Sequence, residues 1–318
     1  MKSTFRNFIL ALFAGIVSPG LLFAQDPEFT QFYANPLYLN PAFAGANKCP
    51  RFVLNYRNQW PALTGQFVTT SASFDKYFCG IGGVGVLITN DNAGEGTLKT
   101  TNASLLYAWH QPLNRFLSIS AGFQGTFAQK KVDWDKLSFG DMIDPRRGFT
   151  RPTEEVPTEG IARYFDMSAG IMLHSSRFFL GFASHHLAEP DEYLLSGPSP
   201  LPRKYTGHAG AVIPVSNHDD VSISPNVLFQ AQQDFRQLNL GLYVNKGPIT
   251  GGFWYRNQDS FIILLGLQQK SFRVGYSYDV TISKLSNQTA GSHELSFQTS
   301  LACKKCKKKF RTVVCPSF

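Results

Sequence analysis

Apolar and polar residues alternate at every second position in many short segments of this sequence, and this pattern constrains the fold more than any other feature. Between residues 272 and 282, for example, Phe, Val, Tyr and Ile alternate with Arg, Gly, Ser, Asp and Thr. Successive side chains of a β-strand point to opposite faces of a sheet, so such a segment has one apolar and one polar face. A wall between lipid and a polar lumen needs this kind of strand.

The pattern predicts about fourteen antiparallel strands, an even number as is usual for bacterial membrane barrels. Only 16% of the residues are charged, against about 25% in a typical soluble domain, and this low fraction suits an all-β chain with two unlike faces. After residue 24 no apolar run reaches the ~18 residues of a membrane helix. The predicted strands lie at 51–60, 67–77, 80–90, 97–110, 115–130, 162–174, 176–185, 203–213, 219–231, 235–245, 249–257, 260–269, 271–282 and 292–302.

The lengths of the connections alternate as well. Counted from the first gap, the even-numbered gaps are mostly tight, such as 112–114 and 246–248, whereas the odd-numbered gaps include the two longest, 131–161 and 186–202. Outer-membrane barrels have short periplasmic turns and longer external loops, and a β-sandwich has no reason to sort its loops in this way. We therefore expect an all-β fold, a single outer-membrane β-barrel over residues 51–302.

The ends of the chain carry all of its net charge of +8. Residues 1–24 contribute Lys2 and Arg6, and the tail 303–318 contributes six basic residues, so residues 25–302 have no net charge. A nucleic-acid surface would spread its basic residues over a folded face, so no nucleic-acid partner is expected. Residues 1–24 read as a signal peptide. Both the N- and the C-terminus should then be periplasmic.

A segment of different character, residues 25–50, precedes the first strand. It is dense in aromatic residues and Asn-Pro steps, and Pro36 and Pro41 exclude a regular helix or strand across it. Large aromatic side chains stabilise a fold mainly when they are buried. We therefore expect an irregular plug in the lumen or a cap under the periplasmic mouth.

This segment also resembles a known family. Residues 26–33 (DPEFTQFY) and 35–45 (NPLYLNPAFAG) look like the start of PorP/SprF proteins, and residues 57–61 (RNQWP) match as well. The basic tail that closes on residues 315–318 (CPSF) is also similar. The resemblance spans the whole mature chain.

The resemblance implies an outer-membrane barrel without enzymatic activity, in which there are no catalytic residues to carry over. Members of the family belong to the type IX secretion and gliding machinery of Bacteroidetes. Their partners are periplasmic components of the machinery and a secreted surface protein with a type IX C-terminal domain. Some members help to secrete and hold one cognate adhesin, and others couple the motor complex to the outer membrane.

Three groups of residues are candidates for binding these partners. One group lies in the N-terminal segment, one in the basic tail and one in the longest loop. The simpler interpretation of the loop arginines is a solvated loop, and that of the tail is a flexible, solubilising end. The candidates are Phe29, Tyr33, Asn35, Pro36, Tyr38, Asn40, Pro41 and Phe43 of the N-terminal segment, Lys304, Lys305, Lys307, Lys308, Lys309 and Arg311 of the tail, and Arg146 and Arg147 of the longest loop.

The five cysteines are expected to form a disulfide rather than a metal site. Zinc usually takes four ligands, the lysines beside Cys303 and Cys306 repel a divalent cation, and an oxidising periplasm favours disulfides. The pair is expected among Cys49, Cys303, Cys306 and Cys315. Because five is an odd number, one cysteine stays free unless pairing is intermolecular, and Cys79, in a tight turn, is the candidate.

No other cluster predicts catalysis. His185 and His186 precede a loop with Glu189 and Asp191, where a solvated loop base is the simpler interpretation and a ligand site the alternative. The glycines of 80–85 lack the helix that a dinucleotide-binding motif must open, so they fit a lumen-facing strand or close packing of the plug. No nucleophile stands beside a base in a recognisable pattern. We expect no enzyme activity, no cofactor and no metal.

These observations together predict an outer-membrane component of the type IX secretion and gliding machinery, in contact with outer-membrane lipid, that anchors or assists export of a cognate cell-surface protein. The alternative is an outer-membrane transport barrel for small solutes, because a barrel of about fourteen strands has a wide lumen. A secreted β-rich adhesin is a third possibility, against which the alternation of loop lengths argues.

Overall fold

The computed structural model describes residues 26–302 apart from 64, 145, 151–152, 154–159, 195–197, 216–220, 258, 270 and 283–289. The expected signal peptide (1–24) and basic tail (303–318) lie outside the described residues.

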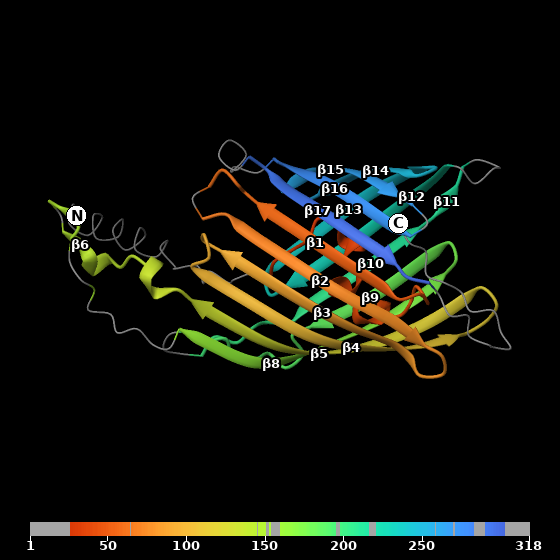
Figure 1. Cartoon of the computed structure of the whole chain (residues 1–318), viewed down its shortest axis with the longest axis horizontal. Coiled ribbons are helices and arrows are strands. Elements are labelled where there is room, and N and C mark those ends of the chain that lie inside the picture. The colour runs from red at the N-terminus through yellow and green to blue at the C-terminus, as the bar shows by residue number, and fades with distance from the viewer. Residues whose placement is uncertain are drawn as a thin grey trace, which may run out of the picture.

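Within the described residues, fourteen long strands form a closed antiparallel barrel, which confirms the predicted fold. Neighbouring strands pair in order along the chain, and β1 pairs with β17 to close the ring (Figure 1). The predicted ranges differ from the observed bounds by at most a few residues. The strands are β1 (Arg51–Gln59), β2 (Phe67–Phe78), β3 (Gly82–Ala93), β4 (Leu98–Pro112), β5 (Leu117–Val132), β8 (Ile161–Ser175), β9 (Phe178–His185), β10 (Lys204–Ala211), β12 (Val221–Gln232), β13 (Phe235–Lys246), β14 (Ile249–Arg256), β15 (Ser260–Gln268), β16 (Phe272–Thr281) and β17 (Ser292–Ser300).

The two faces of the wall differ as the alternation predicted. Outward side chains are large and apolar and are exposed on the isolated chain, for example Leu105 at 68% and Leu265 at 63%. Inward side chains are mostly small or polar and are buried, for example Ser104 and Ser120. So large an exposed apolar surface is unfavourable in water, and it is the surface that a lipid bilayer covers.

The connections sort by length between the two ends of the barrel. At one end, here called the long-loop mouth, the chain between β5 and β8 contains η3 (Trp134–Lys136), η4 (Gly140–Met142) and a hairpin of β6 (Ile143–Asp144) and β7 (Gly148–Phe149). At the other end, the short-turn mouth, β1 begins and β17 ends. The connection from β10 to β12 at this end holds β11 (Ile213–Pro214), which extends the pairing of β12.

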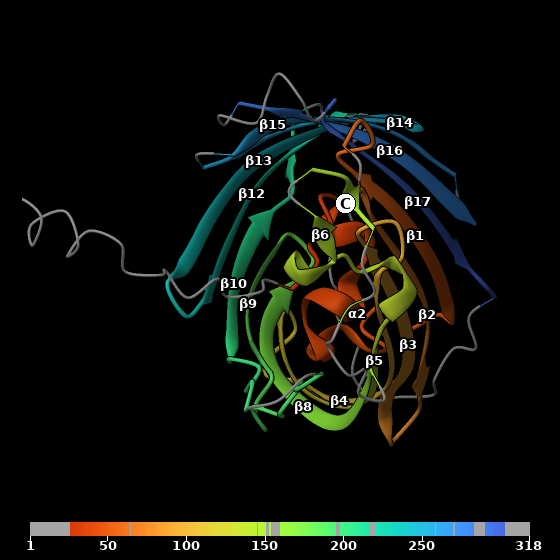
Figure 2. The same cartoon turned by 90° about the vertical axis from the view of Figure 1, so that its left-hand side faces the viewer.

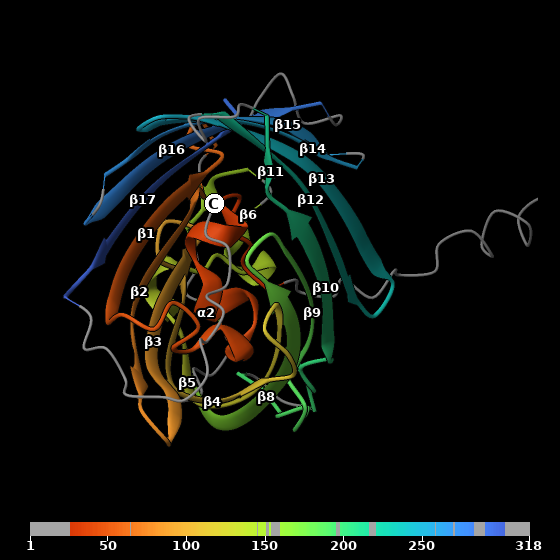
Figure 3. The same ribbon diagram turned by 90° about the vertical axis from the view of Figure 1, so that its right-hand side faces the viewer.

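The segment before β1 lies inside the barrel, as Figures 2 and 3 show from the two mouths. It contains three short helical pieces, η1 (Phe32–Ala34), α2 (Pro36–Leu39) and η2 (Pro41–Phe43). α2 and η2 each begin with a proline. In the first turn of a helix the backbone N–H that proline lacks would have no partner within the helix. A proline also prevents the preceding helical piece from continuing. Residues 26–46 are called the plug below. In the described part of the chain, no helix is long and apolar enough to cross a membrane.

The plug runs along the lumen from one mouth towards the other. Asp26 lies near the long-loop mouth, where its carboxylate contacts His186 at 2.7 Å just after the end of β9. Arg51 begins β1 opposite Ser300 at the short-turn mouth. The first described residues and the last described strand end therefore lie at opposite mouths. The described part of the segment therefore threads the lumen and does not cap one mouth.

Candidate functional site

Two glycines of the barrel wall let the plug backbone lie directly on the sheet. A Cβ atom at Gly83 would lie 1.9 Å from the carbonyl oxygen of Ala44, and one at Gly122 would lie 2.3 Å from the amide nitrogen of Ala42. Cβ atoms do not approach other atoms to within 3.0 Å, so any side chain here would displace the plug. The interpretation of the glycines at 80–85 as close packing against the plug is confirmed at Gly83.

Asn40 holds the middle of the plug to three strands. Its side-chain nitrogen donates to the carbonyl oxygens of Ile171 on β8, at 3.2 Å, and Phe182 on β9, at 3.3 Å. The same nitrogen lies 3.1 Å from Nε2 of His208 on β10. Gly170 makes room for the amide, since a Cβ there would lie 2.1 Å from its Oδ1. The oxygen caps η2 by accepting from a backbone N–H two residues later, as asparagine commonly does at a helix start.

A buried ionic cluster binds the plug at Thr30 and Gln31. Arg57 on β1 contacts Asp279 at 3.0 Å and Glu294 at 3.4 Å, and these three side chains are almost completely buried. Thr30 donates through Oγ1 to Asp279 at 2.7 Å and accepts from Arg57. The backbone N–H of Gln31 donates to Glu294 Oε1 at 3.1 Å. Buried charges are tolerated only when they are paired and hydrogen-bonded. The plug therefore supplies hydrogen bonds that the buried charges of the wall need.

A second set of polar contacts holds the plug towards the short-turn mouth. The amide of Gly45 donates to Asp75 at 2.8 Å, and the other oxygen of Asp75 accepts from Nε of Arg51 at 2.8 Å. Nε2 of His110 lies 2.7 Å from the carbonyl oxygen of Ala44. Contacts of this kind at both ends and in the middle mean that the plug is bonded along its whole length.

The eight plug residues singled out as partner-binding candidates lie inside the barrel. The ring of Tyr33 packs against Phe179 and Trp254 of the wall, with centroids 5.3 and 5.9 Å apart. The ring of Tyr38 is half-buried, and its hydroxyl donates to the carbonyl of Pro27. All eight are buried or half-buried in the lumen, namely Phe29, Tyr33, Asn35, Pro36, Tyr38, Asn40, Pro41 and Phe43.

Arg146 and Arg147 are placed quite differently from the plug. Both are exposed in the turn between β6 and β7, where their backbone amides donate to Asp144 at 2.9 and 3.2 Å. They lie beyond the long-loop mouth and far from the plug contacts described above. The basic tail candidates, Lys304, Lys305, Lys307, Lys308, Lys309 and Arg311, fall outside the described residues.

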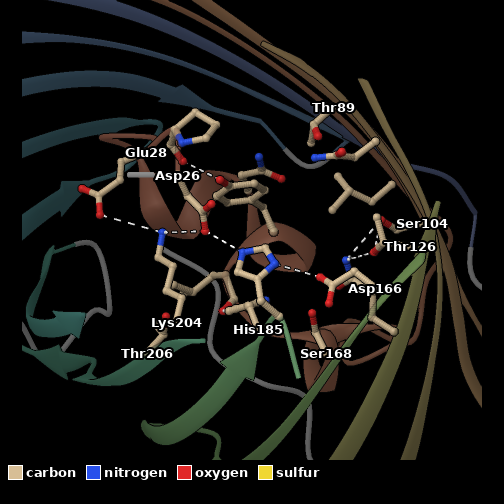
Figure 4. Close-up of a pocket in the computed structure, with 18 of the residues that line it drawn as sticks. Asp26, Glu28, Thr89, Ser104, Thr126, Asp166, Ser168, His185, Lys204 and Thr206 are labelled. Atoms are coloured by element: carbon tan, nitrogen blue, oxygen red, sulfur yellow. Dashed lines mark hydrogen bonds and ion pairs between the residues drawn. The ribbon is translucent and has the colours of Figure 1, made fainter. Parts of the chain in front are cut away.

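A cavity of about 100 Å³, lined by both polar and apolar side chains, separates part of the plug from the wall on the side of the long-loop mouth. Figure 4 shows Asp26, Glu28 and Lys204 among its lining groups, with Asp166 and Ser168 further along the wall. A volume of this size holds several waters, each of which needs about 10–15 Å³. Sequence reasoning missed this cavity, because its walls come from the plug and from several strands far apart in the sequence.

His186 joins the plug to the wall at this cavity. Its Nδ1 lies 2.8 Å from Asp166 and its Nε2 lies 2.7 Å from Asp26. Burial disfavours the charged ring, but the attraction of Asp26 and the hydrogen bonds to both carboxylates outweigh burial and raise the pKa of His186 to about 10. Burial also disfavours the charge of Asp26, but His186 and Lys204 lower the pKa of Asp26 well below its usual range.

The interpretation of His185 and His186 as a solvated loop base is wrong. His185 is half-buried, with Nε2 3.4 Å from the carbonyl oxygen of Leu39, and His186 is held between two carboxylates. Only the later residues of that cluster are solvent-exposed, as at Glu189. The plug, which the local sequence does not reveal, supplies the partners. Among the described residues, no group of three or more His, Cys, Asp or Glu could hold a metal ion.

Both cysteines within the described residues are in disulfides, Cys49 and Cys79. The choice of Cys79 as the free cysteine is therefore wrong. The chain just after the plug reaches the end of β2 that precedes Cys79, where Lys48 Nζ lies 4.0 Å above the ring of Tyr77. Of the residues expected to pair, Cys303, Cys306 and Cys315 lie outside the described part of the chain.

A family model described as "Type IX secretion system membrane protein PorP/SprF" matches residues 21–299 of the chain. The match covers the plug and all of the barrel strands except the last residue of β17. No curated protein matches the chain.

Several solved barrels are distantly similar. The toluene transporter TbuX of Ralstonia pickettii has a TM-score of 0.49 and 11% identity over 84% of this chain and 93% of its own. A FadL homologue of Pseudomonas aeruginosa has a TM-score of 0.47 and 12% identity over 89% and 96%. The outer-membrane protein Omp33 of Acinetobacter baumannii has a TM-score of 0.45 and 7% identity over 80% and 100%.

Proposed function

Because the chain belongs to the PorP/SprF family of type IX secretion system membrane proteins, we propose that it anchors or assists the export of one cognate cell-surface protein at the outer membrane. The family match over residues 21–299 is the observation that carries this proposal. Its partners are then the periplasmic components of the machinery and a secreted protein with a type IX C-terminal domain.

The proposed orientation puts the long-loop mouth outside the cell. Long external loops and short periplasmic turns are the usual arrangement in such barrels. Since β17 ends at the short-turn mouth, the tail 303–318 then enters the periplasm. Its six basic residues are suited to an acidic partner or to anionic head groups there.

The exposed loop beyond the long-loop mouth is the proposed contact for the surface protein. Arg146 and Arg147 present two exposed positive charges in the turn of the β6–β7 hairpin, and the described strands of this hairpin pair only with each other. The plug residues would not contact the surface protein themselves, because their side chains lie inside the barrel. In this proposal the plug closes the lumen and holds the barrel shape that presents the loops.

The proposed role needs no catalysis. A transport barrel for small solutes is the less favoured alternative, because a solute would have to pass beside or displace a plug that is bonded to the wall at Thr30, Asn40 and Gly45. Solute flux into liposomes containing the purified protein separates the two functions. An anchoring barrel gives no flux above that of protein-free liposomes.

The test of anchoring compares cells that carry charge-reversed variants. In Arg146→Glu/Arg147→Glu, surface proteomics should show loss of one surface protein from the cell exterior. Arg115→Glu is the matched control, because Arg115 is exposed in the turn between β4 and β5 at the opposite mouth. If deletion of the whole gene leaves every surface protein correctly located, the proposed function is wrong.

A further inference from the structure

The cavity beside His186 carries buried acceptor atoms that have no hydrogen-bond partner. Within the described residues these atoms are Oδ1 of Asp166 and the side-chain oxygens of four amides, and all five residues line this one cavity. The amides are Asn35, Asn102, Gln124 and Gln230. Buried polar atoms in native proteins are nearly always satisfied. Five such acceptors around one space indicate a ligand or ordered waters that supply donors.

Asp166 is the most informative of these groups. It is 4% exposed, and its Oδ2 is already occupied by Nδ1 of His186 at 2.8 Å. An amide can present either oxygen or nitrogen to a cavity, but an ionised carboxylate can only accept. The free oxygen of Asp166 therefore requires a donor in the cavity whichever way the amides are turned.

The charges around the cavity select a cationic donor. Both ring nitrogens of His186 face carboxylates, so both carry hydrogen and the ring is positive. Lys204 adds a second positive charge, 3.9 Å from Asp26 and 3.9 Å from Glu28. Against these two cations stand three carboxylates, those of Asp26, Glu28 and Asp166. Among the lining residues there is thus one more carboxylate than cations, and the nearby Arg256, which also attracts Glu28, is shared with Asp259 and Asp279.

We propose that this cavity binds a primary ammonium or guanidinium group, which donates to Asp166 Oδ1 and to the surrounding amide oxygens. Such a group has three to five N–H donors and no acceptor, the complement of this lining. It could come from a small free amine or from a Lys or Arg side chain of a protein partner that enters through the long-loop mouth. The inference goes beyond the proposed function, because it concerns the barrel alone and is independent of secretion.

The test measures binding to the purified full-length chain in detergent micelles by titration calorimetry. Agmatine, which carries both groups, should bind, and 1,4-butanediol, which is neutral, should not. N-acetyl-arginine amide separates the two sources. If it binds as well as agmatine, the cavity accepts a side chain presented on a backbone. If agmatine alone binds, the ligand is a free amine.

Two variants and a matched control locate the site. Asp166→Asn should weaken agmatine binding by roughly tenfold or more, since it removes a charge-assisted hydrogen bond. Gln230→Leu should weaken it several-fold while preserving the barrel. Gln237→Leu is the control, because Gln237 is the cross-strand neighbour of Gln230 on β13, but it does not line the cavity and its Oε1 already accepts from Asn239 at 3.1 Å.

The result for each variant is read alongside heat-modifiable gel migration, which reports the folded barrel. Absence of agmatine binding to the wild-type chain overturns the proposal. So does equal affinity in folded Asp166→Asn and wild type, or a loss in Gln237→Leu as large as in Gln230→Leu. A failure of the surface-protein experiment would leave these outcomes unchanged, so the two proposals fail separately.

Discussion

Replacing Gly122 by alanine is the smallest change that should unseat the plug. The added Cβ would lie 2.3 Å from the amide nitrogen of Ala42 and 2.4 Å from the carbonyl carbon of Pro41, whereas ordinary contacts begin at 3.4 Å. Both neighbours are backbone atoms and cannot rotate away as a side chain can. The plug must therefore move by about 1 Å at this point, the difference between these distances.

The expected cost follows from two effects. Overpacking of a tight contact costs about 1–3 kcal/mol. A 1 Å displacement also stretches the hydrogen bonds of Asn40, now 3.2 and 3.3 Å, beyond useful range, and each such bond contributes about 1 kcal/mol. Docking of the plug should therefore weaken by about 3–5 kcal/mol, which corresponds to a rise in the open population of roughly 100-fold or more.

Hydrogen exchange read by mass spectrometry measures this opening directly. Amides of residues 36–46 should exchange faster in Gly122→Ala, while those of the outer strands keep their protection. Gly207→Ala is the matched control, since Gly207 also lies in a barrel strand but a Cβ there meets no atom within 4 Å. Equal exchange of the plug in the two variants would refute the idea that the wall glycines form its seat.

Three further predictions concern the other fastenings of the plug. The pKa of His186 is raised to about 10. Protonated His186 therefore stabilises the docked plug fully below pH ~6.5, the ordinary pKa of histidine, and this stabilisation is lost as the pH rises through about 10. Protection of the amides next to Asp26 should fall across that alkaline range, and His186→Gln should remove the pH dependence. Thr30→Val removes a hydroxyl that bonds two buried charged groups, so urea titration should show a loss of about 1–3 kcal/mol; an unchanged midpoint would contradict the role of the ionic cluster. Non-reducing peptide mapping should find Cys49 and Cys79 in one linked fragment, whereas a link from Cys49 to a tail peptide would show that the C-terminal segment folds back to this mouth.

The barrel could be predicted from sequence because the membrane imposes it locally. Each strand must be apolar outside and polar inside, so a segment such as 272–282 reveals its fold without reference to any other segment. The same holds for the loops, whose lengths report on which mouth they belong to. Errors in the strand ranges are confined to the ends, where a pleated pattern fades gradually into a turn.

The site could not be predicted in the same way, because its contacts join positions far apart in the sequence. Nothing near His186 indicates that Asp26, 160 residues earlier, lies against its ring. The free cysteine was misjudged for a similar reason, since the tight turn at Cys79 gives no hint that the end of the plug reaches it. The sequence gives only a weak indication of the site. Arg57 and Glu294 occupy inward positions of membrane strands, where a charge is costly without a partner.

The interdependence of plug and wall follows from those inward charges. Arg57 and Glu294 sit on β1 and β17, the two strands whose pairing closes the barrel. The attraction between Arg57 and Glu294 is set against the cost of removing both charges from water, and the backbone N–H groups of Thr30 and Gln31 add two hydrogen bonds to Glu294 that help to offset this cost. A buried ion pair that loses a partner is strongly destabilised. Seating of the plug and closure of the barrel at this seam should therefore be one cooperative event rather than two. A plug fastened to the closing seam is suited to a permanent structural role, and it would resist the repeated release that a gate for solutes requires.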